Sequence, residues 1–335
     1  MDPSRLHEAV ATWFNRHGRA LPWRDPSVGA WGVLVSEVML QQTPVARVLP
    51  VWREWMARWP APADLAGAST AEVLRTWGRL GYPRRALRLQ QAAGVIATEH
   101  DGVVPGTEEE LRRLPGVGEY TAAAVVAFAY RGRAVVLDTN VRRVLARLVG
   151  GEALPAPSLT MAERARAVAV LPDAAAESAR WNAAVMELGA LVCTARAPAC
   201  TGCPVADQCA WLAAGRPADR HAHRRRRQPW EGTDRQARGS LMAALRNSRA
   251  PVPAEDLARA WPHAEQRRRA LRTLVADGLA EHSPAGYHLP GFTQRRDGAQ
   301  PRDGAQGRDA GGALGPSRDP AASAGSGAVG SRCEQ

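Results

Sequence analysis

The chain of 335 residues contains no lysine, so arginine supplies all 44 of its basic side chains. Catalysis through a Schiff base normally needs a lysine amine, and here only the N-terminal amine is left for it. The sequence also lacks an apolar run long enough to span a membrane. Residues 1–14 contain acidic side chains and no continuous apolar segment, unlike a secretory signal peptide. We therefore expect a cytoplasmic protein, with a monomer as the default state.

Cysteine is scarce, and its spacing is unusual. A cytoplasmic protein keeps its thiols reduced, so the five cysteines are not expected to form disulfides. Cys193, Cys200, Cys203 and Cys209 follow the pattern C-x6-C-x2-C-x5-C. A structural zinc site usually has two separated C-x2-C pairs, and only one such pair is present. Four thiolates in one compact loop better suit a [4Fe–4S] cluster, which takes one thiolate per iron. We predict this cofactor, with zinc as the alternative.

The charge of the chain is strongly positive, with a formal net charge of +11. Such an excess favours a polyanionic partner, nucleic acid first and a membrane surface second. Solvated runs of charge are the alternative explanation for part of it. If DNA is the partner, the protein would be associated with the nucleoid.

A glycine hairpin between two helical segments supports the nucleic-acid interpretation. Residues 108–114 predict a short helix with an acidic first turn, and residues 119–130 predict a buried one. Pro115 and the glycines Gly116 and Gly118 break the helix between them. A tight glycine turn before a helix exposes several backbone N–H groups, which can hold a phosphate without reading its base. An ordinary turn between core helices is the alternative.

The remaining pattern predicts an all-α core over residues 1–212, because no sustained period-two alternation occurs there. Residues 213–232 form a basic linker that includes the run HAHRRRRQ. Residues 233–290 contain three short helical patterns and a hairpin, which predict a small winged-helix-like module. Residues 291–335, rich in Gly, Ala, Arg, Asp and Pro, predict a disordered tail.

Four segments together resemble a known family. SEVMLQQT at 36–43, LPGVGEYTAAA at 114–124, LDTNVRRVLAR at 137–147 and MELGALVC at 186–193 resemble the helix-hairpin-helix DNA glycosylases with an iron–sulfur loop, the endonuclease III-like superfamily. The Gln-Gln pair is similar to that of the A/G-mismatch adenine DNA glycosylases. The resemblance implies a six-helix part at about 30–132 and a cluster part at 1–29 and 133–212. The DNA and its extruded base would lie between them.

The resemblance also implies residue roles. Glu37 corresponds to the acid that protonates adenine, and Asp138 to the carboxylate that supports the sugar cation. Tyr120 stands where strand-cleaving members carry lysine. Further residues match positions around the base pocket, namely Arg19, Leu21, Trp23, Arg24 and Asn140. Others match positions that enter the duplex, namely Gln41, Gln42 and Tyr82. Gly116 and Gly118 are the hairpin glycines.

Three substitutions and one missing domain depart from the family pattern. Ala183 stands where relatives often carry Gln or Glu, Thr139 where Gly is frequent, and Pro83 in place of a second aromatic residue. No Nudix-like domain follows the linker. The preference for 8-oxoguanine over guanine opposite the adenine is therefore left open.

The predicted function is the flipping and hydrolytic excision of adenine mispaired with guanine or 8-oxoguanine in double-stranded DNA. Without lysine, we expect little or no strand cleavage. The apolar helical neighbours of Glu37 should bury it and raise its pKa, so that it stays protonated as a general acid. Asp138 should stay ionised, held by helix N-terminal amides. The alternatives are a thymine or uracil mismatch glycosylase of the same fold, and a non-catalytic DNA-binding iron–sulfur sensor.

Overall fold

The computed structural model describes residues 2–224 and 230–291. Within these ranges helices form nearly all of the regular structure, and the strands are confined to one short hairpin, so the all-α prediction is confirmed. No helix in this part of the chain is long and apolar enough to cross a bilayer. The predicted tail from residue 292 onward, including Cys333, and residues 225–229 of the basic linker lie outside the described residues.

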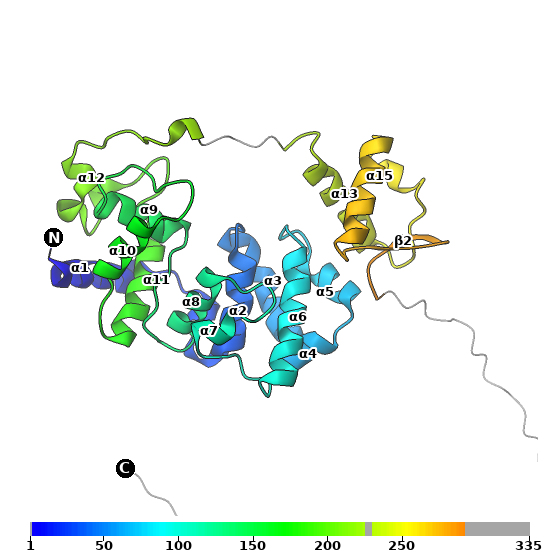
Figure 1. Ribbon diagram of the computed structural model, residues 1–335, viewed down its shortest axis with the longest axis horizontal. Helices are drawn as coiled ribbons and strands as arrows, with labels where there is room; N and C mark the ends of the chain where they lie inside the picture. The colour runs from blue at the N-terminus through cyan, green and yellow to red at the C-terminus, as the bar shows by residue number, and fades with distance from the viewer. Residues whose placement is uncertain (1, 225–229, 292–335) are drawn as a thin grey trace, which may run out of the picture. The chain divides into compact units, whose positions relative to one another are not determined.

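The first half of the chain is a succession of helices, which Figure 1 colours from blue to teal. The bounds are α1 Pro3–His17, α2 Gly29–Leu40, α3 Val45–Arg58, α4 Pro62–Gly67, α5 Thr70–Trp77, α6 Arg84–Glu99, α7 Glu108–Leu111 and α8 Glu119–Phe128. Two 3₁₀ helices, Pro22–Arg24 and Pro26–Val28, precede α2. Helix α4 was not predicted, because six residues are too few to show a helical period. Helix α7 ends three residues earlier than predicted.

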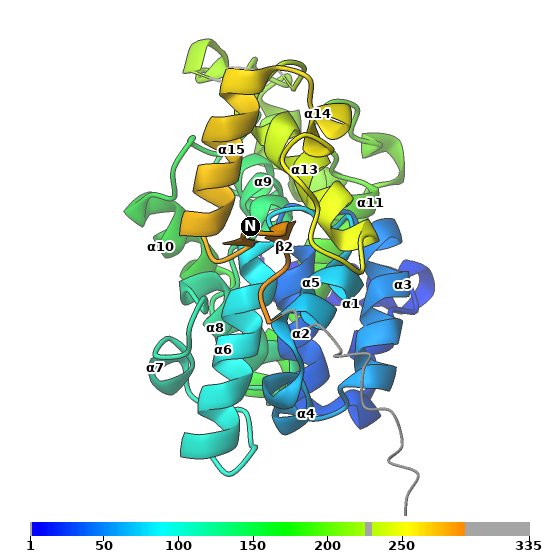
Figure 2. The same ribbon diagram turned by 90° about the vertical axis from the view of Figure 1, so that its right-hand side faces the viewer.

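Helix α2 occupies the centre of this half. It packs against α3, α6 and α8, and Figures 1 and 2 both show α2 and α6 side by side. Nine of its twelve residues are buried. A helix that is apolar on all sides must be surrounded by protein, so the sequence of α2 alone predicts its central place. One of the buried residues is the acid Glu37.

Tryptophan fills much of the space beside α2. The Trp55 ring meets Trp59 at 4.9 Å and Trp77 at 5.5 Å between centroids, both edge to face. Edge-to-face pairs at such distances add stabilisation beyond the buried area. Trp55 and Trp77 are among the largest fully buried side chains, so they join α3 to α5 within one apolar cluster.

A second apolar cluster joins the N-terminal helix to the later part of the chain. Leu6 and Val10 of α1 pack with Val144 and Leu188, whose helices lie more than a hundred residues further on. Helix α11 contacts both α9 and α1. These later helices are α9 Thr139–Leu148, α10 Met161–Ala169, α11 Ala175–Leu191 and α12 Ala210–Ala213, with 3₁₀ helices at Cys200–Gly202, Ala206–Gln208 and Ala222–Arg224.

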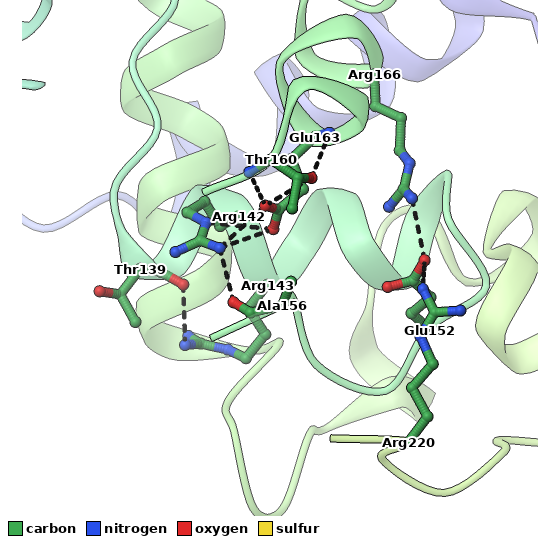
Figure 3. A network of polar contacts seen from close by, with 9 residues as sticks. All are labelled: Thr139, Arg142, Arg143, Glu152, Ala156, Thr160, Glu163, Arg166 and Arg220. Carbon is green, nitrogen blue, oxygen red and sulfur yellow. Dashed lines mark hydrogen bonds and ion pairs between the residues drawn. The ribbon is translucent and has the colours of Figure 1, made fainter. Parts of the chain in front are cut away.

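A polar network fixes α9 to α10 (Figure 3). The Arg142 guanidinium donates to Glu163 Oε1 at 2.9 Å and to the carbonyl of Ala156 at 2.8 Å. Glu163 also closes a capping box with Thr160 at the start of α10. Arg166 pairs with Glu152 at 3.0 Å. Because Arg142 sits in the first turn of α9, the network holds the helix end that follows Asp138.

The C-terminal module has three helices and a hairpin, as the winged-helix prediction requires. Its bounds are α13 Asp234–Asn247, α14 Leu257–Ala260, α15 Ala264–Ala276, β1 Glu281–Ser283 and β2 Gly286–His288. The strands are antiparallel with His282 opposite Tyr287, and Val252 bridges Tyr287 on the other side. Leu241 and Leu271 of the module belong to the same apolar cluster as α5 and α6. The domain boundaries stay a prediction.

Candidate active site

One open cavity of about 1350 Å³ gathers the predicted site residues. It lies among α2, the hairpin before α8, the start of α9 and α11. Of the predicted catalytic and DNA-contacting residues, only Tyr82 is not part of its lining. The lining includes Arg19, Leu21, Trp23, Arg24, Glu37, Gln41, Gln42, Gly116, Gly118, Tyr120, Asp138 and Asn140. The departures Thr139 and Ala183 also line this cavity. Residues up to 168 positions apart thus meet at one place.

Glu37 is a buried acid at the inner wall of the cavity, with 4% of its surface exposed. The Tyr120 hydroxyl donates to Glu37 Oε2 at 2.7 Å. Burial raises the pKa of Glu37 to about 7, the Tyr120 hydrogen bond lowers it, and the negative charge of Asp138 raises it. Loss of hydration disfavours the charged form of a carboxyl, so Glu37 is protonated in a large fraction near neutral pH.

Asp138 caps the start of α9, as its position in the sequence predicts. Its Oδ1 accepts from the Val141 backbone N–H at 2.6 Å, and its Oδ2 accepts from Asn140 Nδ2 at 2.7 Å. Burial nevertheless raises the pKa of Asp138 above its ordinary value, and these hydrogen bonds offset only part of that rise. The two carboxyls therefore differ in surroundings: Asp138 accepts from a helix amide, whereas Glu37 lies among apolar side chains with one hydroxyl donor.

Glu187 of α11 is a site residue that the sequence prediction missed. Its carboxylate accepts from Arg19 Nε at 2.6 Å, from Arg19 Nη2 at 2.9 Å and from Arg24 Nη2 at 2.8 Å. Although burial raises it, these charged hydrogen bonds lower the pKa of Glu187 to about 2. Glu187 stands in the segment MELGALVC, and an acid among these apolar residues was the available signal. Glu187 holds both predicted base-pocket arginines at the cavity wall.

Leu21 and Trp23 line the cavity but belong mainly to the core. They are 8% and 7% exposed, and the Trp23 ring packs edge to face on Trp52 at 5.7 Å. The loop at residues 19–24 is therefore held in two ways. Leu21 and Trp23 pack into the apolar core, and Arg19 forms an ion pair with Glu187.

Gln42 and Tyr82 both have left-handed backbone conformations, with φ of 57° and 46°. Such values are uncommon for residues other than glycine and cluster at functional positions. Both side chains are exposed. Gln41 lies between them and the hairpin helix, and its Nε2 donates to Thr121 Oγ1 at 3.2 Å. The strain is therefore placed where the family resemblance expects side chains that enter the duplex.

Arg85, another residue that the sequence prediction missed, ties these two turns together. Its Nη1 donates to the carbonyls of Val38 at 2.8 Å and Gln41 at 2.5 Å, and its Nη2 donates to Gly81 at 3.2 Å. The guanidinium also lies over the Tyr82 ring, at 5.5 Å from its centroid. Burial lowers the pKa of Arg85 to about 10, which still leaves it cationic at neutral pH.

The hairpin has the geometry that the glycines predict. Val117 N–H donates to the Leu114 carbonyl at 3.1 Å, and Gly116 has a φ of 81°. A Cβ at Gly116 would lie 2.7 Å from the Cβ of Arg88, whereas a Cβ at Gly118 would meet nothing within 4 Å. Gly118 is the N-cap of α8. Gly116, Gly118 and Glu119 line the cavity, so the start of this helix borders it.

The four cysteines of residues 193–209 are partly buried and free of disulfides. The Cys203 thiol lies within electrostatic reach of the other three cysteines. Burial first, and then the charges of Cys193, Cys209 and Cys200, raise the pKa of Cys203 to about 11. Among the described residues, no three Cys, His, Asp or Glu side chains meet around one ion position. Four thiols in one short loop match the one thiolate per iron that a [4Fe–4S] cluster takes.

Two buried arginines of α9 hold this cysteine loop. Arg147 Nη1 donates to Cys193 Sγ at 3.3 Å and to the Thr194 carbonyl at 2.7 Å. Arg143 Nε donates to the Cys193 carbonyl at 2.7 Å. Their cationic charge would offset the negative charge of thiolates on a cluster, and the same helix begins at Asp138. The four cysteines would hold the cluster, which cross-links the loop when bound.

Comparison with known proteins agrees with this geometry. Residues 35–169 match the HhH-GPD superfamily of base excision DNA repair proteins, and residues 193–209 match the iron–sulfur binding domain of endonuclease III. The second match runs from the first to the fourth cysteine of the loop, which confirms the iron–sulfur prediction. The adenine DNA glycosylase of Mycobacterium tuberculosis is 52% identical over 286 residues, 84% of this chain and 92% of that protein. This chain belongs to the adenine DNA glycosylase family.

Other relatives show how far the similarity extends. The adenine DNA glycosylase of Mycolicibacterium smegmatis is 51% identical over 83% of this chain and 93% of its own length. The human adenine DNA glycosylase is 42% identical, over 60% of this chain and 38% of its own length. The mycobacterial matches therefore extend past residue 212 toward the C-terminal module, because residues 1–212 make up less than two thirds of the chain.

Solved structures share the fold. A thermostable thymine-DNA glycosylase superimposes with a TM-score of 0.57 at 25% identity, over 63% of this chain and 97% of that one. A non-covalent endonuclease III–DNA complex superimposes with a TM-score of 0.54 at 24% identity, over 65% of this chain and all of that one. The family members bind DNA, and the cavity described above is where this fold brings its acidic residues together.

Replacement of Glu187 by Gln should destabilise the protein in a pH-dependent way. The pKa of Glu187 is depressed, so its stabilising effect is full above the ordinary value of 4.5 and is lost as the pH falls toward 2. At neutral pH we expect a loss of about 2–3 kcal/mol in the free energy of unfolding, reduced because the arginines are partly exposed. Urea unfolding from pH 7 to pH 3 measures it. The exposed Glu177→Gln of the same helix is the control, and a difference that stays constant across pH would contradict the prediction.

Gly116→Ala should weaken both folding and DNA binding. The alanine Cβ would meet Arg88 at 2.7 Å and would sit on a backbone with φ of 81°. We expect a loss of about 2–3 kcal/mol in stability from strain and overpacking. Gly118→Ala, which has open space around its Cβ, should cost less than about 1 kcal/mol. Thermal unfolding and duplex affinity measure both variants, and equal losses would refute the steric argument.

Proposed function

We propose that this protein releases adenine mispaired with guanine or 8-oxoguanine from double-stranded DNA, as a monomeric enzyme of base excision repair. The observation that carries the proposal is the shared cavity of Glu37 and Asp138, where one carboxyl has a pKa of about 7 and the other is a hydrogen-bonded helix cap. The relatives named adenine DNA glycosylase support adenine as the base, since they are up to 52% identical to this chain.

The chemistry follows from the two carboxyls. A duplex hides the bond between base and sugar, so the adenine nucleotide must first leave the stack and enter the cavity. Protonated Glu37 then gives its proton to the base, which leaves as a neutral molecule. The sugar becomes positively charged as the bond breaks, and the Asp138 carboxylate stabilises that charge. Water completes the hydrolysis at the sugar carbon.

The absence of lysine limits the reaction to hydrolysis. Tyr120 lies in the cavity and donates to Glu37, where strand-cleaving relatives would present an amine. A phenol cannot form a Schiff base with the opened sugar, so no covalent path to strand cleavage is available at this position. We propose a monofunctional enzyme that leaves an intact abasic strand.

A thymine or uracil mismatch glycosylase is the second candidate, because the solved thymine-DNA glycosylase shares the fold. Its sequence identity of 25% is about half that of the mycobacterial adenine DNA glycosylases. Ala183 at the cavity wall leaves an apolar methyl group where a polar side chain could contact a base edge. Both the base that is released and the base opposite it are therefore varied in the duplex experiment below.

Tyr120→Phe should move the pH profile of base release to higher pH. The rate should fall as the pH rises through about 7 in the wild type, because Glu37 then loses its proton. The Tyr120 hydrogen bond lowers the pKa of Glu37, so removing it raises that pKa and shifts the falling limb upward. Single-turnover rates from pH 5 to pH 9 measure the shift. Tyr130→Phe, which removes a hydroxyl bonded to Val104 outside the cavity, should leave the limb in place.

A panel of duplexes tests the function itself. Wild-type protein is incubated with A:G, A:8-oxoguanine, T:G and U:G duplexes under single-turnover conditions. We expect adenine strands alone to become alkali-labile, while the same strands stay intact before alkali. Glu37→Gln should slow adenine release by at least roughly 10²-fold, the usual contribution of a general acid, with duplex affinity retained. Release of thymine or uracil would favour the second candidate, and strand breaks before alkali would refute the hydrolytic mechanism.

A further inference from the structure

A second large depression lies beside the active-site cavity. We call it the arginine groove; it has a volume of about 1330 Å³ and runs between α13 of the C-terminal module and the turn at residues 78–83 that joins α5 to α6. Eight arginines line it, and no carboxylate of the described residues does. Gln41 and Gln42 line both the groove and the cavity, so the two are neighbours across the Gln41–Gln42 loop.

Part of the arginine set builds the walls of the groove. Arg84 and Arg238 pair with Asp277, at 3.3 and 2.6 Å, and so join the module to the start of α6. Arg75 Nη2 also donates to the Ser248 carbonyl at 3.1 Å across the same boundary. The Arg85 guanidinium donates hydrogen bonds to backbone carbonyls, as described above. The two walls are therefore fixed to each other by polar contacts as well as by the shared apolar cluster.

The remaining arginines have no acidic partner among the described residues. Arg79 of the turn and Arg246 of α13 both line the groove, and burial first and then the Arg79 cation lower the pKa of Arg246. Two like charges brought together without a carboxylate create a strong attraction for an anion. Arg88 also lines the groove, and its stem packs on hairpin residue Gly116. The positive surface thus continues toward the hairpin.

Aromatic rings stand at the edge of the groove beside these charges. Arg235 lies over the exposed ring of Trp230 at 5.0 Å and over that of Tyr82 at 5.7 Å. Arginines that alternate with exposed aromatic rings are typical of nucleic-acid surfaces, because they offer both phosphate contacts and stacking faces. Trp230 comes from the end of the linker, Arg235 from α13 of the C-terminal module and Tyr82 from the core.

We propose that the arginine groove holds the phosphate backbone of the complementary strand, the one that does not enter the cavity, opposite the extruded adenine. This proposal rests on the proposed function. The hairpin and Asp138 lie on the cavity side, where the strand that gives up its base must run. Exposed Gln42 lines both the cavity and the groove and exposed Tyr82 lines the groove, and the family resemblance expects both side chains to enter the duplex where the base leaves a gap. The strand beyond that gap is the complementary one, so the module and the core grip it together.

Charge-matched variants test the contact. The double variant Arg79→Gln/Arg246→Gln removes one groove arginine from the core and one from the module. Its control, Arg53→Gln/Arg272→Gln, also removes one from each, at exposed positions that line neither depression and form no ion pair within the described residues. Affinity is measured for a duplex with a stable abasic-site analogue opposite guanine, over a range of salt concentrations. The slope of log affinity against log salt should fall by about 2 for the groove variant, roughly 0.9 per lost phosphate contact, and not for the control.

Uncharged methylphosphonate linkages then identify the strand. Placed on the complementary strand around the opposing base, they should weaken binding by wild-type protein and leave binding by the groove variant unchanged. Placed on the abasic strand, they should weaken both proteins equally. The proposal is overturned if complementary-strand linkages have no effect on the wild type, or if the groove variant loses its response to the abasic strand instead.

Two further measurements keep the result unambiguous. If the double variant has a lower unfolding temperature, the exposed Arg79→Gln alone carries the test, with an expected slope change of about 1. An unchanged slope in that folded single variant would overturn the proposal. Failure of the wild type to release adenine from any mispair would refute the proposed function instead, and the strand assignment is read from binding alone in either case.

Discussion

The burial of one carboxyl beside another is the constraint on which this structure depends. Glu37 lies inside a helix that is apolar on nearly every side, and the charged form of an acid is costly there. Tyr120 offers it one hydrogen bond, too little to offset the lost hydration, so its pKa rises to about 7. Asp138 in the same cavity has a helix amide and an amide side chain as donors. The same cavity therefore holds two carboxyls in different surroundings, one largely protonated near neutral pH and one held by two hydrogen-bond donors.

Arginine side chains form many of the polar contacts that hold the segments around that cavity. The guanidinium group presents several donors in a fixed plane, and a single Arg85 can thus bond carbonyls from two separate turns. Glu187 is an acceptor for two such groups, because its two carboxylate oxygens accept hydrogen bonds from Arg19 and Arg24. Arg147 reaches the cysteine loop from the helix that Asp138 caps. Through these contacts the cysteine loop, the loop at residues 19–24 and the turns at residues 41–42 and 81–82 are all fixed to the helices that carry the acids.

The C-terminal module extends this arrangement. Its apolar residues share a cluster with α5 and α6, and Asp277 of the module pairs with Arg84 at the start of α6. The mycobacterial relatives match over more of the chain than the glycosylase core alone occupies. A module that is packed firmly against the core can present charge at a defined distance from the cavity.

Local sequence determined much of this protein. The helices, the glycine hairpin, the Asp138 cap, the burial of Glu37 and the cysteine loop all follow from residues within a few positions of one another, because helical period, turn chemistry and loop closure act over short distances. Only the tertiary structure decided which side chains meet across the chain. Tyr120 reaches Glu37 over 83 residues, and Glu187 reaches Arg19 over 168. The arginine groove likewise exists only because α13 packs beside α5 and the turn that follows it. Such pairings depend on how whole helices pack, and no short pattern in the sequence records that packing.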